Sequence, residues 1–368
     1  MKRTIKKNPA EAEPARQLAL HVDTVIHQTP FWASHAGDQD DIILSTRIRL
    51  ARNLAGIPFP TIARREELDT VVERIGNACK SIRMLQPALT VDIRQCKTLI
   101  SKALVERRLI SPVFAESSSA GIAVIDESEQ LSIMVNEEDH LRLQSIQPGL
   151  SLQEAWRQIS RLDDELSEQV EYAFSDKFGY LTACPTNTGT GMRASILIHL
   201  PALSILEQVD QAIKELAPSE LAIRGFYGEG TDIIGNIYQV SNQLTLGRTE
   251  AAIISRLEVI AYKFLDLERN ARDKLLHIHR VRLEDEVFRA LGILQAARVL
   301  SSAELMKHLS MVRLGNELNL IQEIDHRILN ELMIFTQPAH LQLLHENITD
   351  PESRDVLRAR LVREKLAG

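Results

Sequence analysis

The chain has 368 residues, of which 44% are hydrophobic and 25% are charged, and its formal net charge is -7. This composition is typical of a globular protein with more than one domain, and the acidic balance excludes a general nucleic-acid binder, which needs a basic footprint. No apolar run reaches the length of a membrane span, and no signal-peptide pattern follows the basic start, so we expect a cytoplasmic protein. The three cysteines are far apart and form neither a disulfide framework nor a metal-site spacing.

Residues 1–39 have the polar composition of a leader. A short strand is expected at 40–44, and it runs into a segment in which Arg47 and Arg49 flank Ile48. If this segment is extended, the two arginines share one face of the strand and the apolar residues share the other. Two guanidinium groups on one face repel each other unless an anion lies between them, and the alternative is a solvated strand face.

Residues 61–110 have helical spacing, and we expect helices at 66–82 and 99–109. Two β-strands are expected next, at 121–125 and 131–135, and the acidic turn between them indicates a hairpin.

An acidic run ends the second of these strands, where Glu137, Glu138 and Asp139 are followed by His140 and then Arg142. Adjacent carboxylates repel one another, and a cation must offset them. The run is therefore either a functional cluster or a surface loop that caps the following segment.

A glycine-rich turn at 184–191 follows a predicted amphipathic helix at 151–172, and Arg193 joins it to a strand-like run at 194–200. A turn that exposes backbone N–H groups next to an arginine can cradle a phosphate, although an ordinary glycine loop is the alternative. The G-x-G-x-x-A match at 189–194 lacks the preceding strand and following helix of a dinucleotide-binding fingerprint.

A further helix is expected to end at 216, followed by a strand from Leu221 to Arg224 and a glycine loop that carries Glu229. Another strand is expected at 237–243. From Thr249 onward the strand signals stop and helical spacing takes over, which predicts a helical domain.

Separated segments each bring arginine to a strand end or loop. That number of guanidinium groups indicates a multiply charged anion, and a nucleotide triphosphate is the natural candidate. Neither a P-loop nor the signature set of protein kinases is found in the sequence. The arginines are Arg47, Arg49, Arg142, Arg193 and Arg224.

The chain resembles the ATP:guanido phosphotransferases, the superfamily of creatine and arginine kinases, and most closely their bacterial protein-arginine kinase branch. The likeness covers roughly residues 40–250 and rests on specific blocks in the right order. The blocks are Ser45-Thr-Arg-Ile-Arg49, Asn136-Glu-Glu-Asp-His-Leu-Arg142, Cys184-Pro-Thr-Asn-Thr-Gly-Thr-Gly-Met-Arg193 and Arg224-Gly-Phe-Tyr-Gly-Glu229.

The resemblance implies an α+β fold in which an antiparallel sheet is flanked by helices and followed by an all-α C-terminal domain. The expected division is a leader at 1–39, a catalytic domain at 40–247 and a helical domain at 248–368. Two departures select the branch: only a short leader precedes Ser45, and a long helical tail follows Gly247. The missing N-terminal domain of small-molecule kinases would leave the pocket open to a protein side chain.

The resemblance also implies transfer of the γ-phosphoryl group of ATP to arginine side chains of proteins, marking them for regulated degradation or altering their activity. The alternatives are a free-arginine kinase and a catalytically silent phosphoarginine reader. Mg²⁺ would be held by ATP and water rather than by a metal site of the protein. The implied partners are protein substrates with exposed arginines, a Clp-type protease, a zinc-finger activator and a second copy of the chain in a homodimer, with neither nucleic acid nor membrane.

Each implied role maps onto residues of this chain. Glu138 and Glu229 would grip the acceptor guanidinium, with Cys184 close to it, although Cys184 as a structural thiol is the alternative. Arg354, Asp355, Arg358 and Ala359 resemble a phosphoarginine-sensing motif, although a surface helix is the alternative. The implied ATP-binding residues are Ser45, Thr46, Arg47, Ile48, Arg49, Arg142, Arg193, Ala194, Ser195, Ile196, Leu197, Arg224, Gly225, Phe226, Tyr227, Gly228 and Glu229.

Overall fold

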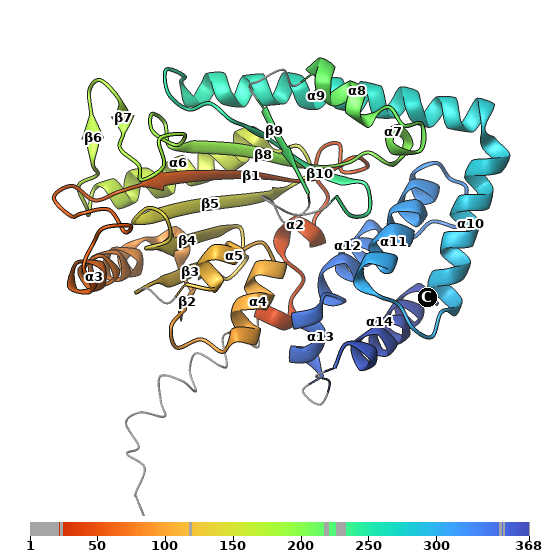
Figure 1. Ribbon diagram of the computed structural model, residues 1–368, viewed down its shortest axis with the longest axis horizontal. Coiled ribbons are helices and arrows are strands. Elements are labelled where there is room, and N and C mark those ends of the chain that lie inside the picture. The colour runs from red at the N-terminus through yellow and green to blue at the C-terminus, as the bar shows by residue number, and fades with distance from the viewer. Residues whose placement is uncertain are drawn as a thin grey trace, which may run out of the picture.

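Strand β1 (Ile43–Arg52) lies at the centre of the structure, a computed structural model shown in Figure 1. The structure describes Val22 and residues 25–117, 120–216, 221–225, 233–345, 348 and 350–367. Hydrogen bonds join β1 to β5 along one edge and to β8 along the other, and both pairs are antiparallel. Only residues 43 and 44 of the short strand predicted at 40–44 belong to β1, where they are continuous with the arginine segment, whereas residues 40–42 form a turn.

A single sheet of eight strands, in the order β2-β3-β4-β5-β1-β8-β10-β9, carries the fold. Each neighbouring pair is antiparallel, which confirms the expected sheet type. A separate short sheet pairs β6 (Phe174–Ser175) with β7 (Gly179–Tyr180). The other strands of the main sheet are β2 (Ala88–Asp92), β3 (Ile122–Asp126), β4 (Leu131–Val135), β5 (Leu141–Pro148), β8 (Met192–His199), β9 (Leu221–Arg224) and β10 (Ile237–Asn242).

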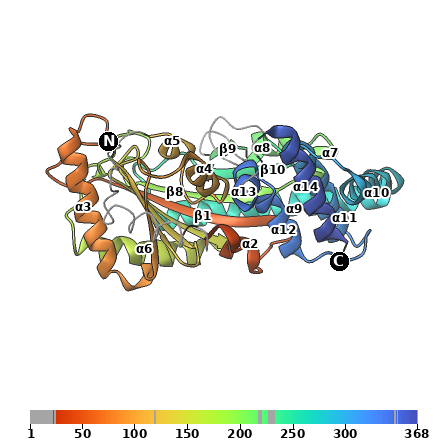
Figure 2. The same ribbon diagram turned by 90° about the horizontal axis from the view of Figure 1, so that it is seen from below.

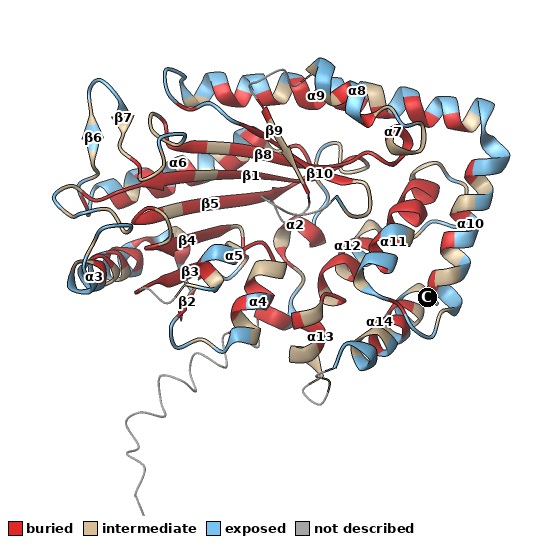
Figure 3. Ribbon diagram, viewed as in Figure 1, coloured by how far each residue is buried: buried red, intermediate tan, exposed pale blue. Residues whose placement is uncertain are grey.

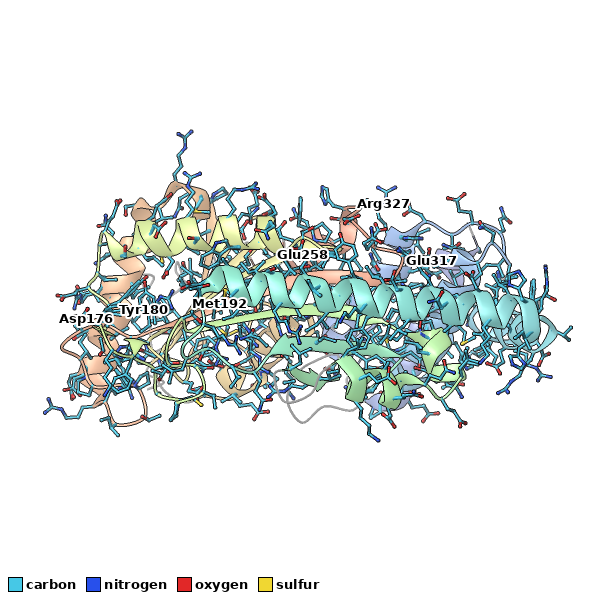
Figure 4. The ribbon with its side chains drawn as sticks, turned by 90° about the horizontal axis from the view of Figure 1, so that it is seen from above. Asp176, Tyr180, Met192, Glu258, Glu317 and Arg327 are labelled. Carbon is cyan, nitrogen blue, oxygen red and sulfur yellow. The ribbon has the colours of Figure 1, made fainter. Side chains whose placement is uncertain are left out.

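Helices α6 (Leu152–Ser167) and α9 (Glu250–Ile278) cover one face of the sheet. Helix α6 packs on β1 and β5, α9 packs on β8 and β10, and the two helices touch each other. Seen from above, α9, which carries Glu258, runs beside α6 (Figure 4). The apolar residues of both helices join the main hydrophobic cluster with Ile48 of β1, as the helical spacing predicts. Helix α3 (Arg65–Ser81) contacts β4 and extends this layer.

A second apolar cluster, centred on Phe114, packs α4 (Thr98–Glu106) and α5 (Pro112–Ala115) against β2, β3 and β4. Two short elements complete this half of the molecule, α2 (Phe31–Ser34) and the 3₁₀ turn η2 (Arg83–Leu85).

The chain after α9 is helical in its described residues, as expected. Figure 2 shows these helices gathered at one end of the sheet, away from α3. Their buried residues belong to the same cluster as the sheet, and Figure 3 shows buried and exposed positions alternating along α9 and α10. None of the described helices is long and apolar enough to cross a membrane. They are α10 (Arg280–Ala296), α11 (Ser302–Glu317), α12 (His326–Phe335), α13 (Pro338–Leu344) and α14 (Pro351–Leu366).

The structure corrects three details of the sequence analysis. Strand β2 interrupts the segment that was expected to be helical throughout. The helix expected to end at 216 is two helices, α7 (Pro201–Ile205) and α8 (Val209–Leu216). Strand β5 was not predicted, and the chain enters it after the acidic run because Asn136, with φ +60, turns the chain back into the sheet.

Candidate active site

Arginines from several strands line one cavity of about 900 Å³ on the sheet face to which Arg47 and Arg49 point. The two β1 arginines meet Arg142 of β5, Arg193 of β8 and Arg224 of β9 there. Register explains the convergence, since Arg49 lies directly opposite Arg193 and Arg142 lies opposite Ala51, two residues along β1. The predicted gathering of distant arginines is therefore present in the structure.

The arginines of β1 are buried among like charges. Burial, together with the neighbouring guanidinium groups, lowers the pKa of Arg47 and of Arg49 well below the ordinary value. Arg47 donates one hydrogen bond to Gln239, at 2.7 Å. The Nε atoms of Arg47 and Arg49 are buried without a hydrogen-bond partner among the described residues. Buried donors and repelling positive charges together favour a bound polyanion.

Arg108 is a further arginine of this cavity, and the sequence analysis did not single it out. It follows the last turn of α4 in a left-handed conformation, with φ +66. Its guanidinium donates to the Ser45 hydroxyl at 2.7 Å and lies 5.8 Å from the centre of the Trp32 ring. Its charge also lowers the pKa of Arg47, after burial and Arg49. Arg108 is 4% exposed, and this burial follows from the fold rather than from any pattern in the sequence.

Two carboxylates of the acidic run face the cavity, and Arg142 holds both. Its guanidinium lies 2.6 Å from the Glu137 carboxylate and 3.4 Å from that of Glu138. Glu137 also accepts a hydrogen bond from the Ser111 hydroxyl. Partial burial raises the pKa of Glu138, and Arg142 opposes that rise. A carboxylate with a raised pKa at the wall of a cavity is suited to accept a proton.

The rest of the acidic run is structural. Asp139 accepts hydrogen bonds from Asn53 and from the Ala183 N–H, both at 2.6 Å, and so ties the strand end to the glycine-rich turn. His140 accepts from the Leu54 N–H at 3.0 Å. Cys184 begins the glycine-rich turn, and its Sγ lies 3.0 Å from the Thr186 hydroxyl oxygen. Glu138 and Cys184 both line the cavity, and their catalytic roles stay predictions.

Several predicted ATP-binding residues are placed away from the cavity lining. Ile48 is fully buried on the other face of β1, and the Thr46 hydroxyl donates to Gly149 O at 2.7 Å. Gly225 is buried at the end of β9. Phe226, Tyr227, Gly228 and Glu229 lie outside the described residues. The buried β8 residues that do not line the cavity are Ala194, Ser195, Ile196 and Leu197.

Comparison with known proteins identifies the family. Residues 70–271 match the family model "ATP:guanido phosphotransferase, C-terminal catalytic domain", and residues 280–368 match "Protein-arginine kinase McsB C-terminal domain". A protein-arginine kinase of Moorella thermoacetica is 46% identical over 92% of this chain and 97% of its own length. A protein-arginine kinase of Halothermothrix orenii is 41% identical over 94% of this chain and 98% of its own length. The chain belongs to the protein-arginine kinase family.

Solved structures of phosphagen kinases share the fold of the catalytic part. A duplicated taurocyamine kinase from Schistosoma mansoni aligns with a TM-score of 0.59 and 26% identity, over 68% of this chain and 38% of that one. A lombricine kinase aligns with a TM-score of 0.57 and 25% identity, over 66% of this chain and 71% of that one.

Arg52 fixes the glycine-rich turn in this member of the family. Its buried guanidinium pairs with Asp163 of α6 at 2.7 Å and donates to Thr190 O at 2.9 Å. The same group lies 3.5 Å from the centre of the Tyr180 ring. Gly191 is required beside it, because its φ is +64 and a Cβ there would lie 2.5 Å from Ala51 O.

The predicted phosphoarginine-sensing motif on α14 contains both buried and partly exposed residues. Arg358 is buried and donates to Thr336 O at 2.9 Å and to Leu300 O at 2.7 Å, and it pairs with Asp355. Ala359 is fully buried, whereas Arg354 is partly exposed. The assignment of the motif to phosphoarginine binding stays a prediction, and within it Arg354 is the residue that a ligand can reach most easily.

Proposed function

We propose that this chain transfers the γ-phosphoryl group of ATP to the guanidinium group of arginine residues in proteins. The observation that carries the proposal is one cavity lined by arginines from several strands, with Glu138 and Cys184 on its wall. The names of the relatives support the same activity. An arginine-lined pocket suits a triphosphate, and a carboxylate suits a guanidinium acceptor.

The arginines would bind the phosphates of ATP and stabilise the charge that spreads over the transferred group. Arg47 and Arg49 supply buried donors for this purpose, and Arg108 adds another guanidinium group. Mg²⁺ would arrive with ATP, held by phosphate oxygens and water. The cavity carboxylates fit this view, because Glu137 and Glu138 are both paired with Arg142 and are therefore not placed as ligands of a metal ion. No cluster of three or more possible metal ligands is found among the described residues.

On the acceptor side, Glu138 would orient the arginine and take its proton. A guanidinium has a pKa above about 12 and is not nucleophilic while it is fully protonated. Attack of its nitrogen on the γ-phosphorus forms the N–P bond and breaks the bond to the bridging oxygen of ADP, while Glu138 accepts the proton. Glu229 is the predicted second carboxylate that would bind the acceptor guanidinium. The negative charge of the Cys184 thiolate would help to hold that guanidinium in place.

The decisive experiment is incubation of the purified protein with labelled ATP and casein. Acid-labile, base-stable label on casein, located on arginine by mass spectrometry of digests kept out of acid, would support the proposal. The same incubation is repeated with free arginine in place of casein, and label on free arginine but not on casein would identify a free-arginine kinase instead. Binding of phosphoarginine without any transfer would identify a silent reader.

The family resemblance extends the proposal to further properties. It supports a homodimer, recognition of marked proteins by a Clp-type protease, and control by a zinc-finger activator. Size-exclusion chromatography with light scattering tests the dimer, and a mass near that of one chain, 41.4 kDa, would contradict it.

A further inference from the structure

The last turn of α4 joins three parts of the molecule through consecutive residues. Glu106 contacts α13, Arg107 contacts the β3–β4 turn, and Arg108 reaches the cavity. The consecutive residues 106–108, at and just after the end of α4, therefore contact both the helical tail and the candidate active site.

Glu106 holds the beginning of α13. Its carboxylate accepts hydrogen bonds from the Ala339 N–H at 2.8 Å and the His340 N–H at 3.0 Å. It also lies 2.9 Å from His340 Nδ1, so that nitrogen carries the ring proton. Nε2 of the same ring is then free to accept from Arg107, 3.3 Å away. His340 is fully buried, so these contacts lie in the interior between the sheet and the tail.

Arg107 and Arg108 carry the connection to the cavity. Arg107 is fully buried, pairs with Glu129 and donates to Gln28 O at 2.6 Å. Arg108 O accepts a hydrogen bond from the Gln144 side chain at 2.9 Å, which fixes the left-handed backbone at this point. The direction of the Arg108 guanidinium toward Ser45 follows from how this turn is held.

We infer that Glu106 is a positioning residue, which uses its grip on α13 to hold Arg108 in place for the nucleotide. The inference rests on the proposed function, since it assigns ATP to the arginine-lined cavity. Without the carboxylate, two backbone N–H groups and one ring N–H of α13 would lose their partner in a buried interface. The end of α4 would then lose one of the contacts that hold it, and a small displacement of a charged donor weakens phosphate binding strongly.

The test compares Glu106→Gln with Glu268→Gln. Glu268 is a matched control because it is a buried glutamate that, like the partly buried Glu106, accepts two backbone N–H groups at a helix start, those of Ala202 and Leu203 in α7. Glu106→Gln is expected to raise the KM for ATP about tenfold or more at an unchanged KM for casein. Glu268→Gln should leave the KM for ATP within about twofold, although both variants lower the Tm.

A double-mutant cycle shows whether Glu106 acts through Arg108. In an Arg108→Ala background, Glu106→Gln should change the KM for ATP by less than about twofold. Full additivity, or equal changes in KM for the two glutamate variants, would overturn the inference. Titration of ADP binding by calorimetry repeats the comparison without phosphoryl transfer. If the wild type binds ADP but labels no arginine, the proposed function fails while the contrast in ADP affinity still decides the role of Glu106.

Discussion

Glu138 must lose its own proton before it can accept one from the substrate. Partial burial raises its pKa, so the protonated form persists to higher pH than in an ordinary glutamate. We expect kcat to fall as the pH falls through this raised pKa, and to be independent of it above. A pH profile at saturating ATP and casein measures this, and a kcat that stays constant down to the ordinary range of glutamate would contradict it.

Removal of the Glu138 charge tests the same role directly. Glu138→Gln keeps the shape of the side chain and removes the proton acceptor, so kcat should fall by about 10²–10⁴-fold, as for loss of a general base. ADP affinity should change little, because the arginines hold the phosphates. Glu66→Gln, on the exposed side of α3, is the control and should retain full activity. A Glu138→Gln enzyme within tenfold of wild type would remove Glu138 from the mechanism.

At the level of single residues, the sequence predicted the strand face on which a side chain lies better than the distant residues that the side chain contacts. The alternation of arginine and apolar residues in β1 was enough to place Arg47 and Arg49 on one face, because strand geometry alone determines it. Arg108 was not predicted, since its role depends on a left-handed turn and on contact with Ser45, which is 63 positions away in the chain. Long-range contacts of this kind leave no periodic pattern.

The glycine-rich turn depends on the contact between β1 and α6. Arg52→Ala would leave the buried carboxylate of Asp163 without its partner, so the free energy of unfolding should fall by about 3–5 kcal/mol. Urea unfolding followed by circular dichroism measures the change. Arg161→Ala, which removes an exposed pair with Glu165 on the same helix, is the matched control and should have little effect. An equal fall in the free energy of unfolding in both variants would show that the buried pair contributes no more to stability than the exposed pair.

Substitutions in helix α14 can separate its structural role from the predicted role in phosphoarginine sensing. Arg358→Ala would leave the carbonyls of Thr336 and Leu300 without their donor, so the free energy of unfolding should fall by at least about 1–3 kcal/mol. Arg354→Ala should leave that free energy unchanged and raise the phosphoarginine concentration that gives a half-maximal response. Loss of stability in Arg354→Ala would contradict this division.

At the level of elements, the strongly periodic helices and the short strands β3, β4 and β9 were predicted correctly, whereas strands β2 and β5 were not predicted. Helices α3 and α6 followed from apolar spacing, because each buries one continuous stripe. Strand β2 has only five residues at the sheet edge, beside a segment with helical spacing. Strand β5 was missed because the acidic run before it resembles a strand end, whereas Asn136 makes a tight turn.

Across the whole molecule, sheet and helical tail share one hydrophobic cluster. Arg358 donates to Thr336 O, and Pro338 begins α13, which Glu106 holds. A continuous set of contacts thus runs from α14 to the arginine-lined cavity. Sequence patterns indicate the helices but not this route, since each contact joins residues that are distant in the chain or on different elements.

Nucleotide binding should stabilise the entire fold, because the phosphates would neutralise guanidinium groups that repel one another in the free protein. At a concentration about 100 times Kd, ADP is expected to add about 2.7 kcal/mol to the free energy of unfolding. Differential scanning fluorimetry measures the rise in Tm, with adenosine as the control that lacks phosphates. Equal stabilisation by adenosine would show that the arginines are not the cause.

The mutual repulsion of buried arginines also bears on how long the protein survives. A protein whose buried guanidinium groups repel one another unfolds more often when adenine nucleotides are scarce, and proteases cleave the unfolded chain. The half-life of the protein in the presence of trypsin should therefore lengthen as the concentration of ATP or ADP rises, so that copies without bound nucleotide are degraded first.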